Sequence, residues 1–437
     1  MKKLIAMLLA CAMVMGLLAA CGGAAPAETK PAADKPAEAP AAEAPAAEAP
    51  AAEAPAEVKD ITLKVWGPQE DQVDASSWLP TMCEKFNAAH PEWNITFVYE
   101  VCPEGDAGKN VTQDPSAAAD VYMFANDQLG TLIQANAIAQ LGGKYLDEVV
   151  ADNSESMIAS VSDTNGDVYG VPFTGNTWFM YYDKSVFTEE DVKSLDTMLE
   201  KGKVSFPLTN SWYIAAFFFA NGGTTFGESG LDAAAGVDFG GEKGAAVTEY
   251  MVNMVKNPNF VMDADGAGMA GLRDGSVNAI FSGTWDAAAV KEALGDNFAA
   301  AQLPTINVGG EAKQLCAFAG SKAIAANPNS QNMQAAVALA VYLGSAEAQL
   351  AHYEMRGIIP TSLALTSDPT IQADPVALAQ ANTIANTSKL QPTLPEMNNY
   401  WTPAENFGKA IHSGEVTVDN AAEKVDAFNA ALNNAGL

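Results

Sequence analysis

Histidine is scarce in this chain, and familiar catalytic motifs are missing. The three histidines, His90, His352 and His412, stand far apart and lack the H-x-x-x-H or H-E-x-x-H spacing that captures zinc. No G-x-S-x-G elbow or P-loop is present, and nothing singles out a catalytic pair among the acidic residues. We therefore expect no metal site, no cofactor and no catalytic residues, and a binding protein rather than an enzyme.

Cysteine is also scarce, which excludes a disulfide framework. Of the five cysteines, Cys11 falls in the expected signal segment and Cys21 directly follows it, so only Cys83, Cys102 and Cys316 belong to the folded part. A bridge between Cys83 and Cys102 is possible from their positions. Buried thiols are the simpler expectation.

Basic residues are few compared with acidic ones. The chain has 23 Lys and Arg against 53 Asp and Glu, a formal net charge of −30, while 49% of its residues are hydrophobic. This balance argues against nucleic acid or anionic lipid as the main partner and indicates an acidic globular protein. About 379 residues follow the N-terminal segments, a length that favours two domains.

No hydrophobic run is long enough to span a bilayer comfortably. The longest, Leu4 to Leu18, follows the basic start Met1-Lys2-Lys3 and precedes Leu18-Ala19-Ala20-Cys21. This pattern is typical of a secretory signal, here residues 1–20, and the last four residues resemble a bacterial lipobox. We expect lipidation at Cys21 and an extracellular protein anchored to the cell membrane. An ordinary signal with a chance cysteine is the alternative.

Residues 21–58 contain no aromatic side chain and consist almost entirely of Ala, Pro and Glu. Such a segment has too little to bury to offset the entropy of ordering it. Its prolines favour extended stretches over a helical spacer. We interpret it as a disordered linker that lifts a folded module off the membrane.

Strand and helix patterns alternate at the start of the module. Ile61, Leu63 and Val65 alternate with polar residues, and apolar residues at helical spacing follow over 78–86. A second strand is expected near 95–99 and a third over 117–124. This order predicts an α/β fold with a parallel sheet, whose ligands gather at the carboxyl ends of the strands.

Two short motifs need to be distinguished from functional sites. Asp163 to Asp167 resembles half of an EF-hand loop, but Thr174 stands where the loop needs a glutamate, so Asn165-Gly166 favours a hairpin. Gly266 to Gly271 matches G-x-G-x-x-G, but no strand precedes it, which argues against a dinucleotide site.

Aromatics make up only 8% of the chain, yet several stand beside polar side chains at expected strand ends and loops. Sugars have apolar C–H faces that flat rings cover and hydroxyl rims that Asp, Asn and Gln satisfy. Core packing explains any single aromatic about as well, although polar neighbours favour a cleft position for Trp212, Trp285 and Trp401. The groups are Phe124 with Asn126, Asp127 and Gln128; Asn176 with Trp178; Trp212 with Tyr213; Trp285; and Tyr400 with Trp401.

At these residues the chain resembles the maltose/maltodextrin-binding proteins and the wider family of extracellular sugar-binding proteins. The resemblance runs from about Ile61 to Leu432. Its five segments are Ile61–Trp66, Ala119–Asp127, Val168–Lys184, Leu272–Trp285 and Gln391–Trp401.

The resemblance implies a periplasmic-binding-protein-like fold, with two α/β lobes, a hinge and an interlobe ligand cleft. It places lobe 1 at 59–174 and 305–360, and lobe 2 at 175–304 and 361–437. The crossings would lie near Thr174, Pro304 and Gly357 to Pro360. It also implies a monomer that carries an oligosaccharide of the maltodextrin class to the permease of an ABC importer.

Site residues follow from the same resemblance. Asp127, Trp212, Trp285 and Trp401 match positions that bind sugar in the family, and Tyr213 adjoins one of them. Phe124 stands where maltose binders usually have a tryptophan, Gln128 where they have an arginine, and Asn176 where they have a glutamate. Glu70 is a further candidate. These departures leave open a different oligosaccharide as the ligand, and the anchored module would also suit a surface glycan adhesin or, less well, a surface glycoside hydrolase.

Overall fold

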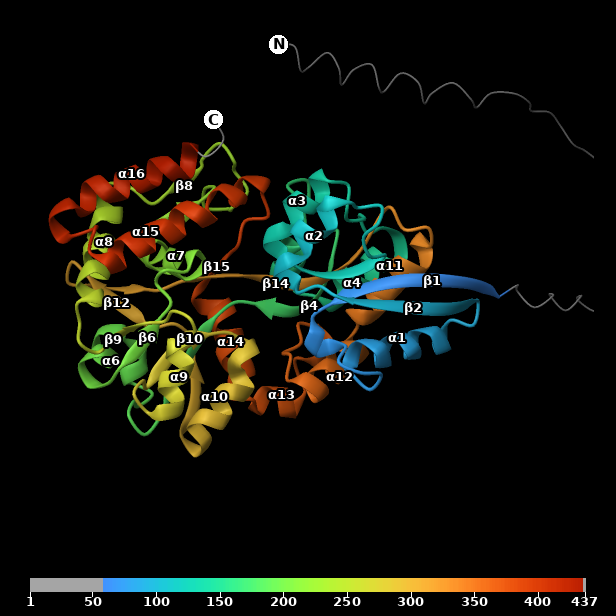
Figure 1. Ribbon diagram of the computed structural model, residues 1–437, viewed down its shortest axis with the longest axis horizontal. Coiled ribbons are helices and arrows are strands. Elements are labelled where there is room, and N and C mark those ends of the chain that lie inside the picture. Colours follow the sequence, from blue (N-terminus) through green and yellow to red (C-terminus); the bar gives the residue numbers. More distant parts are fainter. Residues whose placement is uncertain (1–57, 435–437) are drawn as a thin grey trace, which may run out of the picture. The chain divides into compact units, whose positions relative to one another are not determined.

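The computed structural model describes residues 58–434, and its core is built on two sheets (Figure 1). The predicted signal peptide, Cys21 and nearly all of the predicted linker lie outside the described residues. The first sheet has the order β15-β14-β3-β1-β2, with β4 also paired to β14. Its strands are β1 (Lys59–Gly67), β2 (Trp93–Val101), β3 (Val121–Ala125), β4 (Val171–Asn176), β14 (Ala317–Ala326) and β15 (Ser388–Leu390).

The start of the first lobe follows the predicted strand–helix–strand pattern. β1 pairs in parallel with both β2 and β3, which puts their carboxyl ends at one edge. Helix α1 (Trp78–Ala89) buries Trp78, Met82 and Phe86 against the sheet and ends at His90, ahead of Pro91. The other helices of this lobe are α2 (Ala107–Gln113), α3 (Leu129–Gln134), α4 (Gly143–Asp152), α5 (Glu155–Ser160), α11 (Met333–Leu343) and α12 (Ala346–Arg356).

The second lobe is built on a five-stranded sheet of order β11-β5-β10-β6-β9. These strands are β11 (Phe298–Ala301), β5 (Phe179–Asp183), β10 (Ala279–Ser282), β6 (Val204–Phe206) and β9 (Phe260–Met262). A short pair, β7 (Thr224–Thr225) and β8 (Val237–Asp238), lies apart from it. The helices are α6 (Leu195–Lys201), α7 (Ser211–Ala220), α8 (Gly241–Val255), α9 (Ala267–Asp274), α10 (Ala287–Leu294), α13 (Pro369–Ala373), α14 (Pro375–Asn386), α15 (Trp401–Ser413) and α16 (Ala421–Asn434).

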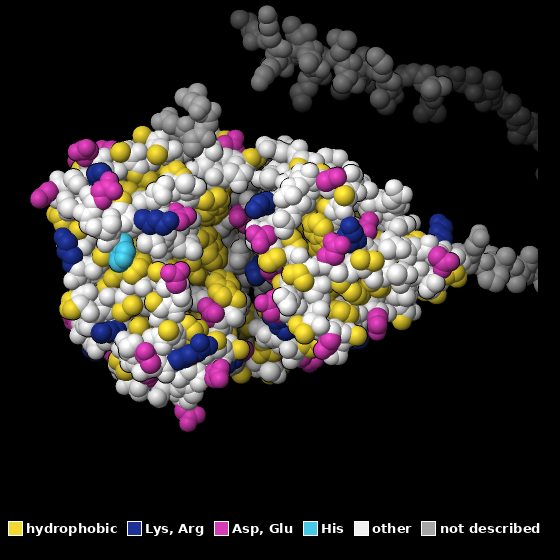
Figure 2. All heavy atoms as spheres, viewed as in Figure 1, with side chains coloured by type: hydrophobic (Ala, Val, Ile, Leu, Met, Phe, Trp, Pro, Cys, Tyr) yellow, Lys and Arg dark blue, Asp and Glu magenta, His cyan; other side chains and the backbone are white. Residues whose placement is uncertain are grey.

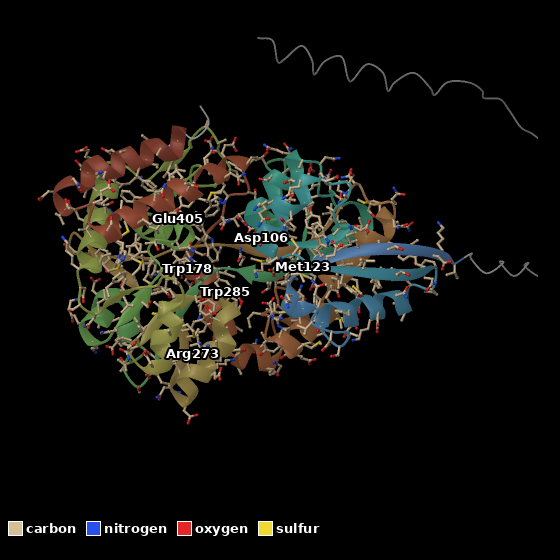
Figure 3. All side chains as sticks on the ribbon, viewed as in Figure 1. Asp106, Met123, Trp178, Arg273, Trp285 and Glu405 are labelled. Carbon is tan, nitrogen blue, oxygen red and sulfur yellow. The ribbon has the colours of Figure 1, made fainter. Side chains whose placement is uncertain are left out.

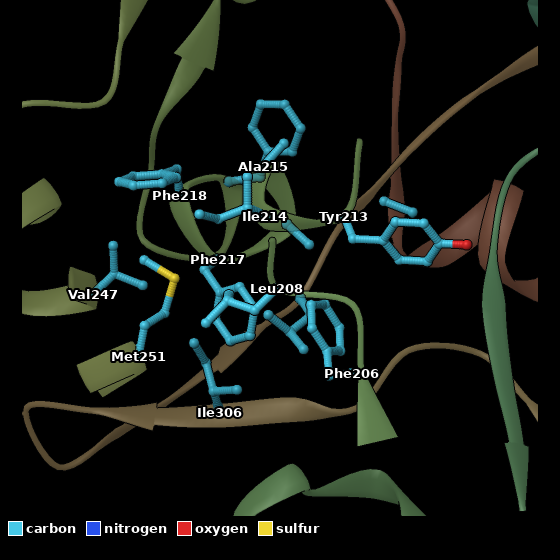
Figure 4. Packing of buried hydrophobic residues seen from close by; sticks show 14 of the residues in the cluster. Phe206, Leu208, Tyr213, Ile214, Ala215, Phe217, Phe218, Val247, Met251 and Ile306 are labelled. Atoms are coloured by element: carbon cyan, nitrogen blue, oxygen red, sulfur yellow. The ribbon is translucent and has the colours of Figure 1, made fainter. Parts of the chain in front are cut away.

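Helix α7 is the centre of the second lobe's core. Every residue from Tyr213 to Phe219 is buried, because α8, α15 and the sheet surround the helix. Figure 4 shows Phe217 and Phe218 packed with Met251 of α8. The Asn210 side chain caps the helix by accepting a hydrogen bond from the Trp212 backbone N–H at 2.9 Å. The cap and this core fix the start of α7, where Trp212 lies.

Two crossings between the lobes lie side by side. The chain passes from β4 to β5 through Thr177 and Trp178, and returns from α12 to the second lobe through Ile359 and Pro360. Thr174 forms an antiparallel bridge with Pro360, and its hydroxyl donates to the Ile359 carbonyl at 2.6 Å. These bonds join the two crossings into one hinge element.

The remaining crossing differs from the prediction. The predicted boundaries put residues 305–314 in lobe 1, but β12 (Thr305–Val308) and β13 (Glu311–Gln314) form a hairpin that packs on α6 and α8 of the second lobe. Figure 4 shows Ile306 in the same cluster as Phe217 and Met251. Gly309 and Gly310 both have positive φ, as a two-residue hairpin turn requires. The crossing is therefore made by β14.

Strand β14 belongs to both lobes. Ala317 and Phe318 at its start lie in the core of the second lobe, while Ile324 and Ala326 at its end lie in the core of the first. Its pairing with β3 and β4 in the first lobe is antiparallel. Any displacement of one lobe relative to the other therefore acts on this strand.

Two smaller predictions are confirmed. Ser162 and Val168 form an antiparallel bridge around the Asn165-Gly166 turn, and Asp163 accepts the backbone N–H groups of Asn165 and Asp167. The Asp163 carboxylate therefore stabilises a hairpin turn. Cys83 and Cys102 are free, buried thiols in separate clusters. Within residues 58–434, no helix has the length and apolar character to cross a bilayer.

Candidate functional site

A cavity of about 650 Å³ opens between the two lobes, where Figure 2 shows a groove across the surface. The first lobe contributes the ends of β3 and β4 and the starts of α2 and α3. The second contributes the starts of α7 and α15 and the loop after β10. The lining residues are Gly105, Gly108, Lys109, Thr112, Ala125, Asp127, Gln128, Thr131, Asn176, Trp212, Trp285, Lys322, Gln391, Asn398 and Trp401.

Asp127 supplies the carboxylate of the first lobe's wall. It lies on the short helix η3 (Asn126–Gln128), which follows the carboxyl end of β3. Burial raises the pKa of Asp127 to about 7, and no ion pair with Lys or Arg is found for it among the described residues. Its oxygens are thus available to a ligand with hydroxyl groups.

Gln128 lines the cavity, but its amide is bonded within the protein. Its Oε1 accepts the Gly108 N–H, and its Nε2 donates to the Glu104 carbonyl at 2.9 Å. The Glu104 side chain in turn pairs with Lys322 at 3.2 Å. Gln128 therefore holds the loop before α2 against η3, rather than presenting a free amide to a ligand.

Three tryptophans form the second lobe's wall. The Trp212 and Trp285 rings have centroids 6.0 Å apart and are tilted by 37°. Trp285 is 46% exposed, whereas Trp178, also labelled in Figure 3, is fully buried. The Trp285 ring covers Gly283 so closely that a Cβ there would lie 2.0 Å from it. Trp401 begins α15 and packs edge-on against Tyr400.

The structure brings six of the nine predicted residues to this cavity and leaves three elsewhere. Phe124 is 0% exposed in the first lobe's core, with an edge contact to Tyr122, so it does not line the cleft. Tyr213 is buried and stacks on Trp178, with centroids 4.7 Å apart. Glu70 is exposed on the short helix η1 (Gln69–Asp71), outside the cavity lining.

Phe124 and Tyr213 lie outside the cavity for geometric reasons. All five residues of β3 are buried, since helices cover the sheet there, so its sequence does not show which side chains face the cleft. Consecutive residues of a helix point about 100° apart, so Trp212 and Tyr213 cannot both face it. Trp212 does, and Tyr213 supports the ring behind it.

Several lining residues had no part in the sequence prediction. Lys109, Thr112 and Thr131 are spaced along two short helices without an aromatic neighbour, and Lys322 lies within a strand whose other residues are apolar except Ser321. Asn398 lies close to the predicted Trp401 in the sequence, and its Nδ2 donates to Thr131 Oγ1 at 3.0 Å across the lobes. Gln391 is the first residue of the last of the five segments that carry the resemblance, and this position could have identified it as a site residue.

The chemistry of the cavity suits reversible binding of a polyol. Its aromatic faces can cover apolar sugar faces, and its carboxylate, amide and ammonium groups can pair with hydroxyls. Asp127 is the one carboxylate among the described residues that line it. Glycoside hydrolysis ordinarily uses two placed carboxylates.

Comparisons with known proteins agree with this geometry. A family model described as "Bacterial extracellular solute-binding protein" matches residues 81–379. A maltooligosaccharide ABC transporter solute-binding lipoprotein of Streptococcus pneumoniae is 26% identical, over 69% of this chain and 74% of its own. A galactooligosaccharide-binding protein of Bacillus subtilis is also 26% identical, over 70% and 75%.

Solved structures extend the similarity. A protein solved with acarbose is 55% identical with a TM-score of 0.82, covering 85% of this chain and 98% of its own. The unliganded maltodextrin-binding protein MalE1 of L. casei is 28% identical with a TM-score of 0.78, covering 85% and 99%. The predicted two-lobed fold is thereby confirmed.

Proposed function

Because the chain belongs to the bacterial extracellular solute-binding proteins, we propose that it captures a maltodextrin-type oligosaccharide between its lobes and delivers it to an ABC importer. The observation that carries this proposal is that aromatic residues of one lobe and polar residues of the other line the same cavity. Trp212, Trp285 and Trp401 stand on one lobe, and Asp127 and Asn176 stand on the other. A ligand that contacts both walls favours the closed arrangement of the lobes.

The α-glucan preference draws its support from the relatives. Proteins named for maltooligosaccharide, maltodextrin and maltotriose recur among them, and the 55% identical structure was solved with acarbose. The galactooligosaccharide-binding relative, at similar identity to the first, makes a galactooligosaccharide the second candidate ligand. Micromolar binding needs only about −8 kcal/mol, which a few stacked rings and hydrogen bonds can supply.

The placement on the cell is part of the same proposal. We infer that the signal peptide is removed, that Cys21 is lipidated, and that residues 21–58 tether a monomeric binding module outside the membrane. The lipoprotein name of the pneumococcal relatives supports this inference. Metabolic labelling with a fatty acid, compared between the native chain and Cys21→Ala, tests it, and equal labelling of both would refute it.

Calorimetric titration tests the ligand. The chain without residues 1–21 would be titrated with maltose through maltoheptaose, and with galacto- and xylo-oligosaccharides as controls. Saturable micromolar binding within the maltooligosaccharide series alone supports the proposal. Binding only to the galactosides would keep the transport function and replace the sugar, and binding to none would refute both.

A further inference from the structure

Trp212 is held by a partner that the sequence prediction did not include. Its indole Nε1–H donates to Gln391 Oε1 at 2.7 Å. Gln391 is only 2% exposed, yet its side chain lines the cavity beside the ring. An indole N–H can only donate, so the glutamine must present its oxygen to Trp212, and this fixes the orientation of the amide.

This bond restricts the ring that meets the ligand. Trp212 packs edge-on against Tyr213 and lies beside Trp285, so these neighbours limit the tilt of its ring while Gln391 holds the edge that carries Nε1. Without an acceptor, a half-buried indole N–H would lose a hydrogen bond or turn toward water. Either change would rotate the flat surface on which a sugar ring stacks.

The same glutamine is tied to the strand that crosses between the lobes. Its backbone N–H donates to the Ala319 carbonyl at 2.7 Å, continuing the parallel pairing of β15 with β14. Further along, the Thr393 hydroxyl donates to the Ser162 carbonyl of the first lobe at 3.3 Å. The backbone here also passes so close that a Cβ on Gly130 would lie 2.5 Å from the Thr393 carbonyl oxygen.

We propose that Gln391 is a positioning residue, which sets the Trp212 ring for sugar stacking and couples that ring to the crossing strand β14. The proposal rests on the proposed sugar-binding function for its effect on affinity. The other part of the proposal, that Gln391 positions the Trp212 indole, can be tested without any ligand. Gln391→Met keeps the length of the side chain and removes the acceptor.

The test combines indole NMR with calorimetry on the chain without residues 1–21. The Trp212 Nε1–H signal is assigned as the one absent from Trp212→Phe. In Gln391→Met this signal should move and exchange faster with solvent, before any ligand is added. Maltotetraose affinity should fall about fivefold, the equivalent of one net hydrogen bond.

A matched control and a rescue make the result specific. Gln380→Met removes an equally buried amide, whose Nε2 donates to the Gly175 carbonyl at 2.8 Å away from Trp212, and should leave the Trp212 signal in place. Gln391→Glu restores an acceptor and should return the signal toward its original position. In the Trp212→Phe background, Gln391→Met should cost less affinity than it does alone.

The outcomes separate the positioning role from the sugar-binding function. An unmoved Trp212 signal in Gln391→Met, or an equal affinity loss with and without Trp212, would overturn the positioning role. If the native chain binds no oligosaccharide, the function fails, while the indole signal still decides whether Gln391 holds the ring.

Discussion

Trp212 and Trp285 come from segments far apart in the sequence and meet with ring centroids 6.0 Å apart. One begins a buried helix, and the other lies on the short helix η5 (Thr284–Asp286) after β10. They differ in what holds them, because Trp212 is bonded to Gln391 while Trp285 is 46% exposed. Trp285 is therefore the better residue for separating binding from folding.

Trp285→Ala should weaken maltooligosaccharide binding about tenfold or more, since it removes a stacking face worth roughly 1.4 kcal/mol. Its free energy of unfolding should fall by only about 1–1.5 kcal/mol, because nearly half of the residue's surface is already in water. Calorimetry and urea unfolding measure the two effects. Leu378→Ala, at a similarly exposed apolar residue outside the cavity lining, is the control, and equal affinity in both variants would contradict the site.

Gln128 and Asn176 should respond in opposite ways to truncation. Gln128→Leu leaves the Gly108 N–H and the Glu104 carbonyl without a partner, so it should cost about 1 kcal/mol of stability. Asn176 makes no side-chain hydrogen bond within the described residues, so Asn176→Ala should lower affinity about fivefold and leave stability nearly unchanged. Unfolding and titration of both variants check this, and the reverse pattern would refute the assignment.

The sequence predicted where helices and strands lie better than it predicted which of their side chains face the cleft. Alternating apolar residues located β1, α1 and β2, and the carboxyl-end rule agrees with the position of Asp127 in the cavity. Asn176 was predicted from the family resemblance and lines the same cavity. Phe124 shows the weakness, because in a strand buried on both faces adjacency to a polar residue does not tell which side chain faces the cleft.

Lobe membership was harder still, because it depends on tertiary packing. Nothing in residues 305–314 says which lobe their hairpin will join. Its packing on α6 and α8, with Ile306 and Val308 buried in the second lobe's core, decides it. Lys322 was missed for a similar reason. It is the single charged residue of a mostly apolar strand, and its place in the cavity depends on a pairing with β4, which is distant in sequence.

The hinge bond of Thr174 predicts a loss of stability with a matched control. Thr174→Val keeps the shape of the side chain but removes the hydroxyl that donates to the Ile359 carbonyl, so it should cost about 1 kcal/mol. Thr383→Val replaces another fully buried threonine whose hydroxyl has no partner among the described residues, so it should be neutral or stabilising. Urea unfolding compares them, and equal costs would contradict the role of the hinge bond.

The partly buried carboxylate of Asp127 predicts how stability depends on pH. Its pKa is raised from 3.8 to about 7 by burial, so between these values the folded state binds more protons than the unfolded state. The contribution of this group to the free energy of unfolding should therefore fall as pH rises from about 4 to 7 and level off above. Asp127→Asn removes this dependence, so the variant should gain stability relative to the native chain at about pH 8, measured by urea unfolding.

Ligand affinity should change in the opposite direction over the same range. The ionised carboxylate accepts hydrogen bonds from neighbouring hydroxyls, and bonds to a charged acceptor are about twice as strong as neutral ones. Affinity for maltotetraose should therefore rise as pH increases through about 7, although the unliganded protein becomes less stable. Asp127→Asn should bind more weakly and with little pH dependence, as titration from about pH 5.5 to 8.5 would measure. Parallel slopes in the native chain and the variant would mean that another group titrates, and that Asp127 does not meet the sugar as a carboxylate.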